Sequence, residues 1–341
     1  MAIDVVQTLP EEEWRRFVYE HPQGSIFHTP EMFQVFSHAK GHHPTLWAAV
    51  GNDGHVLALL LPVRITLIDG LLRHFTTRAV AYDSVLCAPG AEGQEALARL
   101  LYTYKRQVKG ELLFTELRNL SNREAVQPIL REHGFVYEDH LNYLIDLKRP
   151  PEAIFQSIGR RTRKKVRRGL KQGEVVVEEA RERKQVVACY DLLRQTYRAA
   201  RVPLADRSLF EAAFDLLYPK GMVRFTLARL GQTPAAASVE LIYKDVIYGW
   251  YGGVDRAYGS YVPNELLVWH ILKWGAENGY GLYDFGGAGK PDEEYGVRDF
   301  KAKFGGELVC FGRNTCVHAP FLLRLGELGY HVYRSLLWYH L

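Results

Sequence analysis

A lysine that follows a double-glycine turn near the end of the chain has the surroundings of a charge-stabilising group. Segment 280–307 reads YGLYDFGGAGKPDEEYGVRDFKAKFGGE. Gly286 and Gly287 end a short strand, and glycine lets the backbone adopt a positive φ or lets another molecule approach closely. Lys301 follows on a short helix, where its ammonium is a compact point charge for an oxyanion or a phosphate. A lysine that only covers the core with its stem is an equally good interpretation.

The chemistry that suits this pattern is attack of a neutral amine on an activated acyl ester. Such a reaction needs positioning, an oxyanion partner and a proton acceptor. Lys301 is the candidate for the oxyanion. Asp284 is a candidate base or amine-orienting residue, although its strand position suits a structural hydrogen-bond acceptor equally well. Val297, Phe300 and Phe304 fall at i, i+3 and i+7 and predict the face that anchors the short helix. The sequence has no recognisable Ser-His-Asp, Cys-His or metal-ligand spacing, which predicts neither a covalent enzyme intermediate nor a metal.

A strongly basic helix is the second feature. Eight of the twelve residues from Arg160 to Lys171 are Lys or Arg. Residues spaced by four, from Ile158 to Leu170, predict one narrow apolar stripe on this helix. Neighbouring like charges cost stability, so the run favours a polyanionic partner such as RNA, a nucleotide-linked substrate or anionic lipid headgroups, with a solvated face as the alternative. The candidate polyanion-binding residues are Arg160, Arg161, Arg163, Lys164, Lys165, Arg167 and Arg168.

A glycine-containing loop gives a weaker signal. A strand at 247–251 delivers Tyr251 to a second glycine pair, and a loop with Arg256 and Gly259 then opens an amphipathic helix. This order resembles the acyl-CoA-binding turn of GNAT acetyltransferases, where a helix N-terminus cradles a pyrophosphate. The match is limited to one arginine and one glycine, so bound coenzyme A stays an alternative.

Composition and length limit the number of domains and the class of protein. The chain has 341 residues, 47% of them hydrophobic, with 20 Tyr, 16 Phe and a net charge of +4. These values are typical of an enzyme with one large or two ordinary domains, and they give no sign of a DNA-binding protein. Four scattered cysteines favour neither a disulfide framework nor a structural zinc site. We recognise no signal peptide and no membrane-spanning run, which predicts a cytoplasmic protein.

The elements around these residues fall into two similar halves. Lys-Arg-Pro-Pro at 148–151 is typical of a linker. On each side of it the pattern predicts helices, a meander of strands, a helix, a strand, and then a further helix and strand. We therefore expect a duplicated α/β fold with a first domain at 1–149 and a second at 150–314. A terminal helix at 315–341 is predicted to pack back on the first domain.

The whole chain resembles the FemABX peptidyltransferases. The resemblance is carried by GSIFHTPEMFQVFSHAKGHHP near the start, by GRRTRKKVRRGLKQGEVVV, and by IYGWYGGVDRAYGSYVPNELLVWHILKW with the Tyr-Asp-Phe-Gly-Gly to Phe-Lys segment. It implies an α/β (α+β) fold of tandem GNAT-like domains, each a mixed, largely antiparallel sheet flanked by helices. It also implies transfer of an amino acid from aminoacyl-tRNA to an amine of a peptidoglycan precursor or related cell-envelope acceptor.

Site residues follow from the resemblance position by position. Lys301, with Phe300, matches the lysine that stabilises charge in acyl transfer. Tyr251 matches a substrate-contacting tyrosine, and Arg207 matches an arginine that contacts nucleotide-sugar phosphates. The glycines 286 and 287 belong to the segment that matches most specifically. This chain departs from the family at Gln34, where the enzyme acting on a soluble precursor has a phosphate-binding lysine.

Three hypotheses stay open at this point. The first is an aminoacyl-tRNA-dependent transferase without a bound cofactor, in which charged tRNA is the donor. The second is an acyl-CoA-dependent N-acyltransferase that acts on a sugar or envelope amine. The third is a non-catalytic binder of tRNA or of an anionic membrane. The protein is expected in the cytoplasm, where a peripheral contact with the inner membrane surface is compatible with the basic helix.

Overall fold

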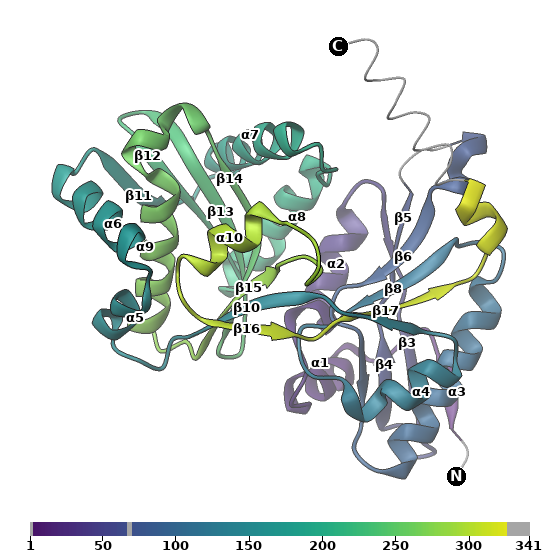
Figure 1. The fold of residues 1–341 in the computed structure, drawn as a ribbon. Coiled ribbons are helices and arrows are strands. Elements are labelled where there is room, and N and C mark those ends of the chain that lie inside the picture. Colours follow the sequence, from purple (N-terminus) through teal and green to yellow (C-terminus); the bar gives the residue numbers. More distant parts are fainter. Residues whose placement is uncertain (1–2, 67–69, 326–341) are drawn as a thin grey trace. The chain divides into compact units, whose positions relative to one another are not determined.

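The computed structural model describes residues 3–66 and 70–325, which form two compact units (Figure 1). The first unit comprises Met1–Ser37, Gly41–Asp139 and Phe311–Leu341, and the second comprises His38–Lys40 and His140–Cys310. Each unit is a mixed sheet structure flanked by helices, as the sequence predicts.

The first unit has two sheets with mostly antiparallel pairing. Their strand orders are β1-β3-β4-β7 and β2-β5-β6-β8-β17-β9, and β6 and β8 are parallel. The helix α3 packs its apolar side on this core, because apolar residues recur along one face from Ala96 to Tyr104. The helices are α1 (Glu11–Glu20), α2 (Pro30–His38), α3 (Ala91–Val108) and α4 (Gln127–Glu132). The strands are β1 (Asp4–Val6), β2 (His42–Pro44), β3 (Trp47–Val50), β4 (Val56–Leu60), β5 (Val63–Thr66), β6 (Thr77–Ala81), β7 (Val85–Cys87), β8 (Phe114–Arg118), β9 (Val136–Glu138) and β17 (Arg313–Val317).

The second unit is built on one seven-stranded sheet with the order β11-β12-β13-β14-β15-β10-β16. Every neighbouring pair is antiparallel except β14 and β15. The helices are α5 (Pro151–Ser157), α6 (Arg160–Gln172), α7 (Arg183–Ala200), α8 (Arg207–Leu217), α9 (Pro263–Glu277) and α10 (Gly296–Ala302). The strands are β10 (Leu141–Asp146), β11 (Val175–Glu179), β12 (Val223–Leu230), β13 (Thr233–Tyr243), β14 (Val246–Val254), β15 (Leu282–Gly287) and β16 (Glu307–Cys310).

Helices cover both faces of this sheet. Ala236 of β13 lies in the core cluster formed with α9. Its neighbour Ala237 is paired with Gly253 of β14, where an added Cβ would lie 2.9 Å from the backbone of Leu192 in α7. Because successive residues of a strand point to opposite faces, α9 and α7 lie on opposite sides of the sheet.

Each unit takes one strand from the other half of the chain. β10 precedes the expected linker at 148–151 but lies between β15 and β16 in the second unit. Residues Arg313–Val317 form β17 between β8 and β9 of the first unit, so the expected helix from 315 begins as a strand. Helical residues follow from 320 to 325, and the rest of the expected helix, 326–341, lies outside the described residues.

This exchange predicts which fragments fold. A fragment of residues 140–310 keeps β10, whereas a fragment of residues 150–310 lacks a strand from the interior of its sheet. We expect the longer fragment to melt cooperatively and the shorter one to show no cooperative transition, because β15 and β16 would lose the ladder that joins them. Circular dichroism melts of both fragments measure this. Equal cooperative melting of the shorter fragment would contradict the exchange.

Candidate active site

The strands β14 and β15 stop pairing part-way along their length. Their parallel ladder joins Val246 to Leu282 and ends with Tyr248 opposite Asp284. β14 continues to Val254 through pairs with β13 on its other edge. From Gly249 onward, backbone N–H and C=O groups on the β15 side of β14 are therefore not used by that ladder, and they can hydrogen-bond to another molecule.

A β-bulge lies at this point of β14. Glu240 of β13 pairs with Gly249, while the preceding Val239 pairs with Tyr251, so Trp250 is an extra residue. A bulge leaves its extra residue out of the ladder and redirects nearby backbone groups. Beyond it, Gly252 is exposed, and an added Cβ there would meet no atom within 4 Å. Backbone donors and free space thus occur together where β14 and β15 part.

The end of β15 forms the opposite side of this parting. Gly286 has a φ of 71°, a conformation that glycine adopts without strain. Its N–H donates to Oδ1 of Asp284 at 2.7 Å, and the side chain of Asn142 donates to the same oxygen at 3.4 Å. Asp284 is buried and holds the turn, which is the structural role that its strand position suggested.

Lys301 is tied to the same turn from the other side. Its Nζ donates to the carbonyl oxygens of Phe285, Gly286 and Gly287 at 2.5, 3.1 and 2.8 Å. The residue is only 8% exposed. Burial lowers the pKa of Lys301 to about 8, against the opposing charge of Asp284. Since an ammonium has three donors, all of them are engaged in this state, and the charge lies behind the glycine turn.

The helix α10 presents a different face from the one that its apolar spacing predicted. Val297 is 43% exposed, whereas Lys301 is the buried residue of the helix. α10 ends at Ala302, so Phe304 lies beyond the helix, but it is buried and packs on Phe300, with the two ring centroids 5.2 Å apart. Residues at i and i+7 share a helix face only while the helix continues, and α10 ends before it reaches Phe304.

Tyr251 lies in an aromatic cluster on the α7 and α8 side of β14. Its ring centroid is 4.8 Å from that of Phe210, 5.0 Å from Trp250 and 5.8 Å from Tyr197. Arg207 is the first residue of α8 and forms an ion pair with Glu211 at 3.2 Å. The cluster gives the bulged part of β14 an apolar wall.

The other predicted binding residue is in the first unit. Gln34 is an exposed residue of α2. The structure thus gathers Lys301, Asp284 and both glycines at one turn, and it places Gln34 on a separate compact unit.

The structure contains the expected basic helix as α6, but its boundaries and its buried face differ from the prediction. It is divided from α5 at Ile158 and Gly159. Leu170 is 58% exposed, and Gly169 is buried instead. An added Cβ at Gly169 would lie 2.9 Å from the side chain of Leu266 in α9. Residues spaced by four drift around a helix by about 40° per step, so the predicted stripe leaves the interface within three steps.

The cations of α6 form two groups. Arg163 donates to Gln156, Lys165 pairs with Glu265 at 3.2 Å, Arg167 stacks on the ring of Phe155, and Arg168 donates to the carbonyl of Ser260 at 3.4 Å. Within the described part of the chain, the exposed side chains of Arg160, Arg161, Lys164 and Lys171 have no such partner. We call these four residues the free ridge. The contacts of Lys165 and Arg168 hold α6 beside the N-terminal end of α9.

Comparisons with known proteins find a matching domain model, similar enzymes and similar folds. Residues 157–301 match the model of an acetyltransferase (GNAT) domain. The lipid II:glycine glycyltransferase of Staphylococcus saprophyticus is 22% identical, over 85% of this chain and 87% of that protein. The enzyme of the same name from Staphylococcus haemolyticus is also 22% identical, over 86% and 88% of the two chains. The crystal structure of FemX superposes with a TM-score of 0.71 at 17% identity, over 95% of this chain and 99% of that one. Over most of its length the chain is therefore similar to FemABX-type transferases, and residues 157–301 match a GNAT domain.

Other solved structures share the tandem fold of this chain. A tandem GNAT protein from the clavulanic acid biosynthesis pathway has a TM-score of 0.58 at 12% identity, over 94% of this chain and 99% of that one. The L-PGS structure from Bacillus licheniformis has a TM-score of 0.56 at 13% identity, over 94% and 97%. The expected fold of two GNAT-like domains is confirmed.

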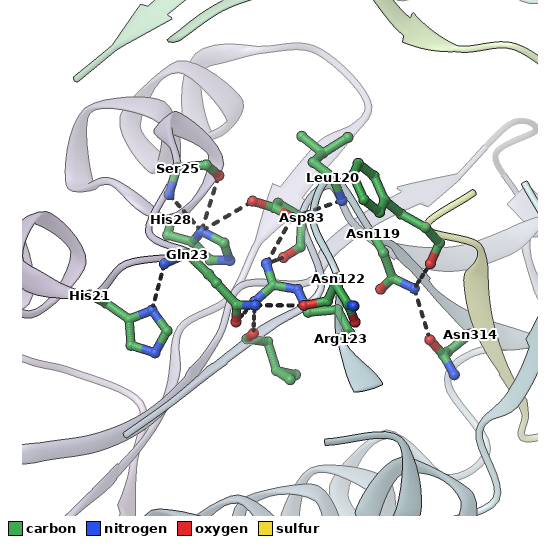
Figure 2. Close-up of polar contacts among 12 residues, drawn as sticks. His21, Gln23, Ser25, His28, Asp83, Asn119, Leu120, Asn122, Arg123 and Asn314 are labelled. Atoms are coloured by element: carbon green, nitrogen blue, oxygen red, sulfur yellow. Dashed lines mark hydrogen bonds and ion pairs between the residues drawn. The ribbon is translucent and has the colours of Figure 1, made fainter. Parts of the chain in front are cut away.

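Figure 2 shows a buried polar cluster in the first unit, which the sequence did not reveal. Arg123 donates to Oδ1 of Asp83 at 2.9 Å and to Oε1 of Gln23 at 2.6 Å. Burial lowers the pKa of His28 to about 4, so its imidazole is neutral, and its Nδ1 lies 3.1 Å from Oγ of Ser25. The cluster joins the loop before α2 to the β6–β7 and β8–α4 connections. Its members are far apart in sequence, so no local pattern indicates them.

Residues 3–66 and 70–325 contain neither a group of metal-binding side chains nor a membrane-spanning helix. No three His, Cys, Asp or Glu side chains there are grouped so that they could hold a metal ion. No helix in those ranges has the length and apolar character needed to cross a bilayer.

The contacts of Lys301 lead to a testable expectation. Lys301→Met keeps the aliphatic stem but leaves three backbone carbonyls without their donor, so we expect the free energy of unfolding to fall by roughly 2–4 kcal/mol. Lys301→Arg should recover part of this stability, because a planar fork replaces a compact charge incompletely. The matched control is Lys303→Met, since Lys303 is exposed on the same segment. Urea denaturation measures all three. Equal stability of Lys301→Met and wild type would contradict a stabilising role for the contacts between Lys301 and the three carbonyls.

Proposed function

We propose that this protein transfers an aminoacyl group from an activated ester to an amine of a peptidoglycan precursor, such as lipid II, or a related cell-envelope acceptor. The observation that carries the proposal is the parting of β14 and β15, where a bulged strand faces a glycine turn held by a buried lysine. The names of the staphylococcal relatives, lipid II:glycine glycyltransferases, support both the aminoacyl group and the acceptor class.

In the proposed reaction, the amine nitrogen forms a bond to the ester carbonyl carbon. The bond from this carbon to the ester oxygen breaks, and a proton from nitrogen goes to the departing oxygen. Redirected N–H groups at the Trp250 bulge are suited to receive the developing charge on the carbonyl oxygen. Lys301 adds a positive charge behind the turn and keeps Gly286 and Gly287 in position. Tyr251 then borders the acyl group on the side of α7 and α8.

The donor we propose is charged tRNA. The free ridge supplies cations that pair with no acid among the described residues, and the N-terminal end of α9, beside which α6 is held, favours a phosphate through its backbone N–H groups. Together they offer phosphate-binding groups on α6 and at the start of α9. Acyl-CoA is the competing donor, because the matched family model is an acetyltransferase domain. The cytoplasmic location and a contact with the membrane surface stay predictions.

A transfer assay decides between these donors. We expect an amide product when aminoacyl-tRNA and a muramoyl-peptide acceptor are both present, and none when acetyl-CoA replaces the charged tRNA. Gly252→Leu is a useful variant here, because its side chain fills open space without a backbone clash. It should lower turnover while leaving the melting temperature unchanged. Product formation from acetyl-CoA alone would favour the acyl-CoA alternative, and tRNA binding without any transfer would favour the non-catalytic one.

The free ridge provides a separate test of tRNA binding. The triple variant Arg160→Gln, Arg161→Gln, Lys164→Gln should weaken tRNA binding and reduce the salt slope by about one for each phosphate that is no longer neutralised. The matched control removes the same charge from partnered positions, as Arg163→Gln, Lys165→Gln, Arg167→Gln. It should affect binding less and stability slightly more, since exposed ion pairs contribute about 0–1 kcal/mol each. Filter binding at several salt concentrations measures both. An equal drop in affinity in the two triples would mean that α6 acts only through its total charge.

A further inference from the structure

Glu240 is a buried carboxyl beside the parting of β14 and β15 that the reaction described above does not use. It is 0% exposed on β13. Its carboxylate accepts a short hydrogen bond from the hydroxyl of Ser238 and one at 3.3 Å from that of Thr226. It also pairs in register with Gly249, the residue directly before the bulge. A titratable group therefore lies one strand away from the point where the ladder with β15 ends.

The hydroxyl of Tyr283 lies beside Gly249, the residue of β14 that pairs with Glu240. An added Cβ at Gly249 would be 2.8 Å from the Tyr283 oxygen, so the phenol occupies the space that a side chain of β14 would fill. Side chains of paired residues on neighbouring strands are about 5 Å apart at Cβ. Because Glu240 pairs with Gly249, the Tyr283 hydroxyl lies in the neighbourhood of this carboxyl, and the charge of Glu240 adds to the burial that raises the pKa of Tyr283. It also lies beside the first residue of β14 that is free of β15.

The charges around Glu240 suit a group that takes up and releases a proton near neutral pH. Burial raises the pKa of Glu240 to about 7, while the Ser238 hydroxyl and then the charge of Arg224 oppose the shift. Arg224 lies on β12 with its guanidinium carbon 4.0 Å from the ring centroid of Trp274 in α9. The other titratable groups that face Glu240 or Arg224 are Tyr283 and Asp284 of β15, Cys189 of α7, Glu179 of β11 and His270 of α9.

We propose that Glu240 accepts, through the hydroxyl of Tyr283, the proton that the acceptor ammonium must lose before it attacks the ester. The ammonium gives one proton to the phenol oxygen as the phenol proton passes to the carboxylate, which leaves a neutral amine and a protonated Glu240. The amine then attacks, its second proton leaves with the ester oxygen, and Glu240 later returns its proton to solvent. This inference rests on the proposed aminoacyl transfer, and Glu240 acts through Tyr283 as a positioning residue.

The test is the pH profile of kcat/KM in three variants of the full chain. Glu240→Gln and Tyr283→Phe should each lower kcat/KM about 10²-fold at neutral pH, the low end of the effect of a positioned proton acceptor. Both should recover as the pH rises and the acceptor amine deprotonates in solution. The matched control is Glu179→Gln, which removes another acid that pairs with Arg224, at 3.3 Å, and should leave the profile unchanged. A decrease that is uniform across pH, or no decrease, would overturn the proposal.

A second measurement separates this inference from the proposed function. The folded pKa of Glu240 lies above the ordinary value of 4.5, so its contribution to stability is complete below that value and is lost as pH rises through about 7. Glu240→Gln should remove this dependence from urea denaturation curves. Thr226→Val removes one donor to the carboxylate and should move the acid limb of kcat/KM to higher pH. Absence of transfer with every donor would overturn the proposed function and this role together, although the titration would persist. A Glu240 that does not titrate between about pH 5 and pH 9 would overturn the inference alone.

Discussion

The contact of one ammonium with three successive carbonyls organises the second unit around its glycine turn. Lys301 lies on α10, and the carbonyls belong to the end of β15, so the contact fixes a helix to a strand across the loop that joins them. Asp284 holds the opposite side of the turn through the N–H of Gly286. Hydrogen bonds on two sides therefore hold the glycine backbone, which restricts its conformational freedom even though glycine has no side chain. A lysine in this position is both part of the scaffold and a fixed positive charge at the end of β15.

The sequence predicted the fold class and the important segments, because these depend on local signals. The glycine turn, the basic helix and the duplicated order of elements are all visible in residue types and spacing. The face of α10 was not predictable, since a seven-residue helix ends before the i+7 position that seemed to define it. The prediction of the buried side of α6 was also wrong. Gly169 is small enough for α9 to approach closely, but a pattern of apolar side chains does not include glycine.

Contacts between residues that are far apart in the chain could not be predicted from the sequence. The partners of Lys301 are backbone carbonyls, which no residue type encodes. The cluster of Asp83, Arg123 and His28 joins three loops, and its members carry ordinary surface residue types. The burial of Glu240 follows from the register between β13 and β14, which alternation within one strand does not give. Most of the site features that the sequence did not predict therefore depend on sheet register and loop packing.

The exchange of β10 and β17 also bears on how the chain folds during synthesis. Domains generally fold from the N-terminus as they leave the ribosome. Here every strand of the second unit's sheet lies between Leu141 and Cys310, so that sheet can close as soon as this stretch has emerged. The six-stranded sheet of the first unit needs β17, which ends at Val317, although its other strands are made first. The unit that begins the chain is thus the last to be completed, and during most of translation β8 and β9 lack the strand that joins them.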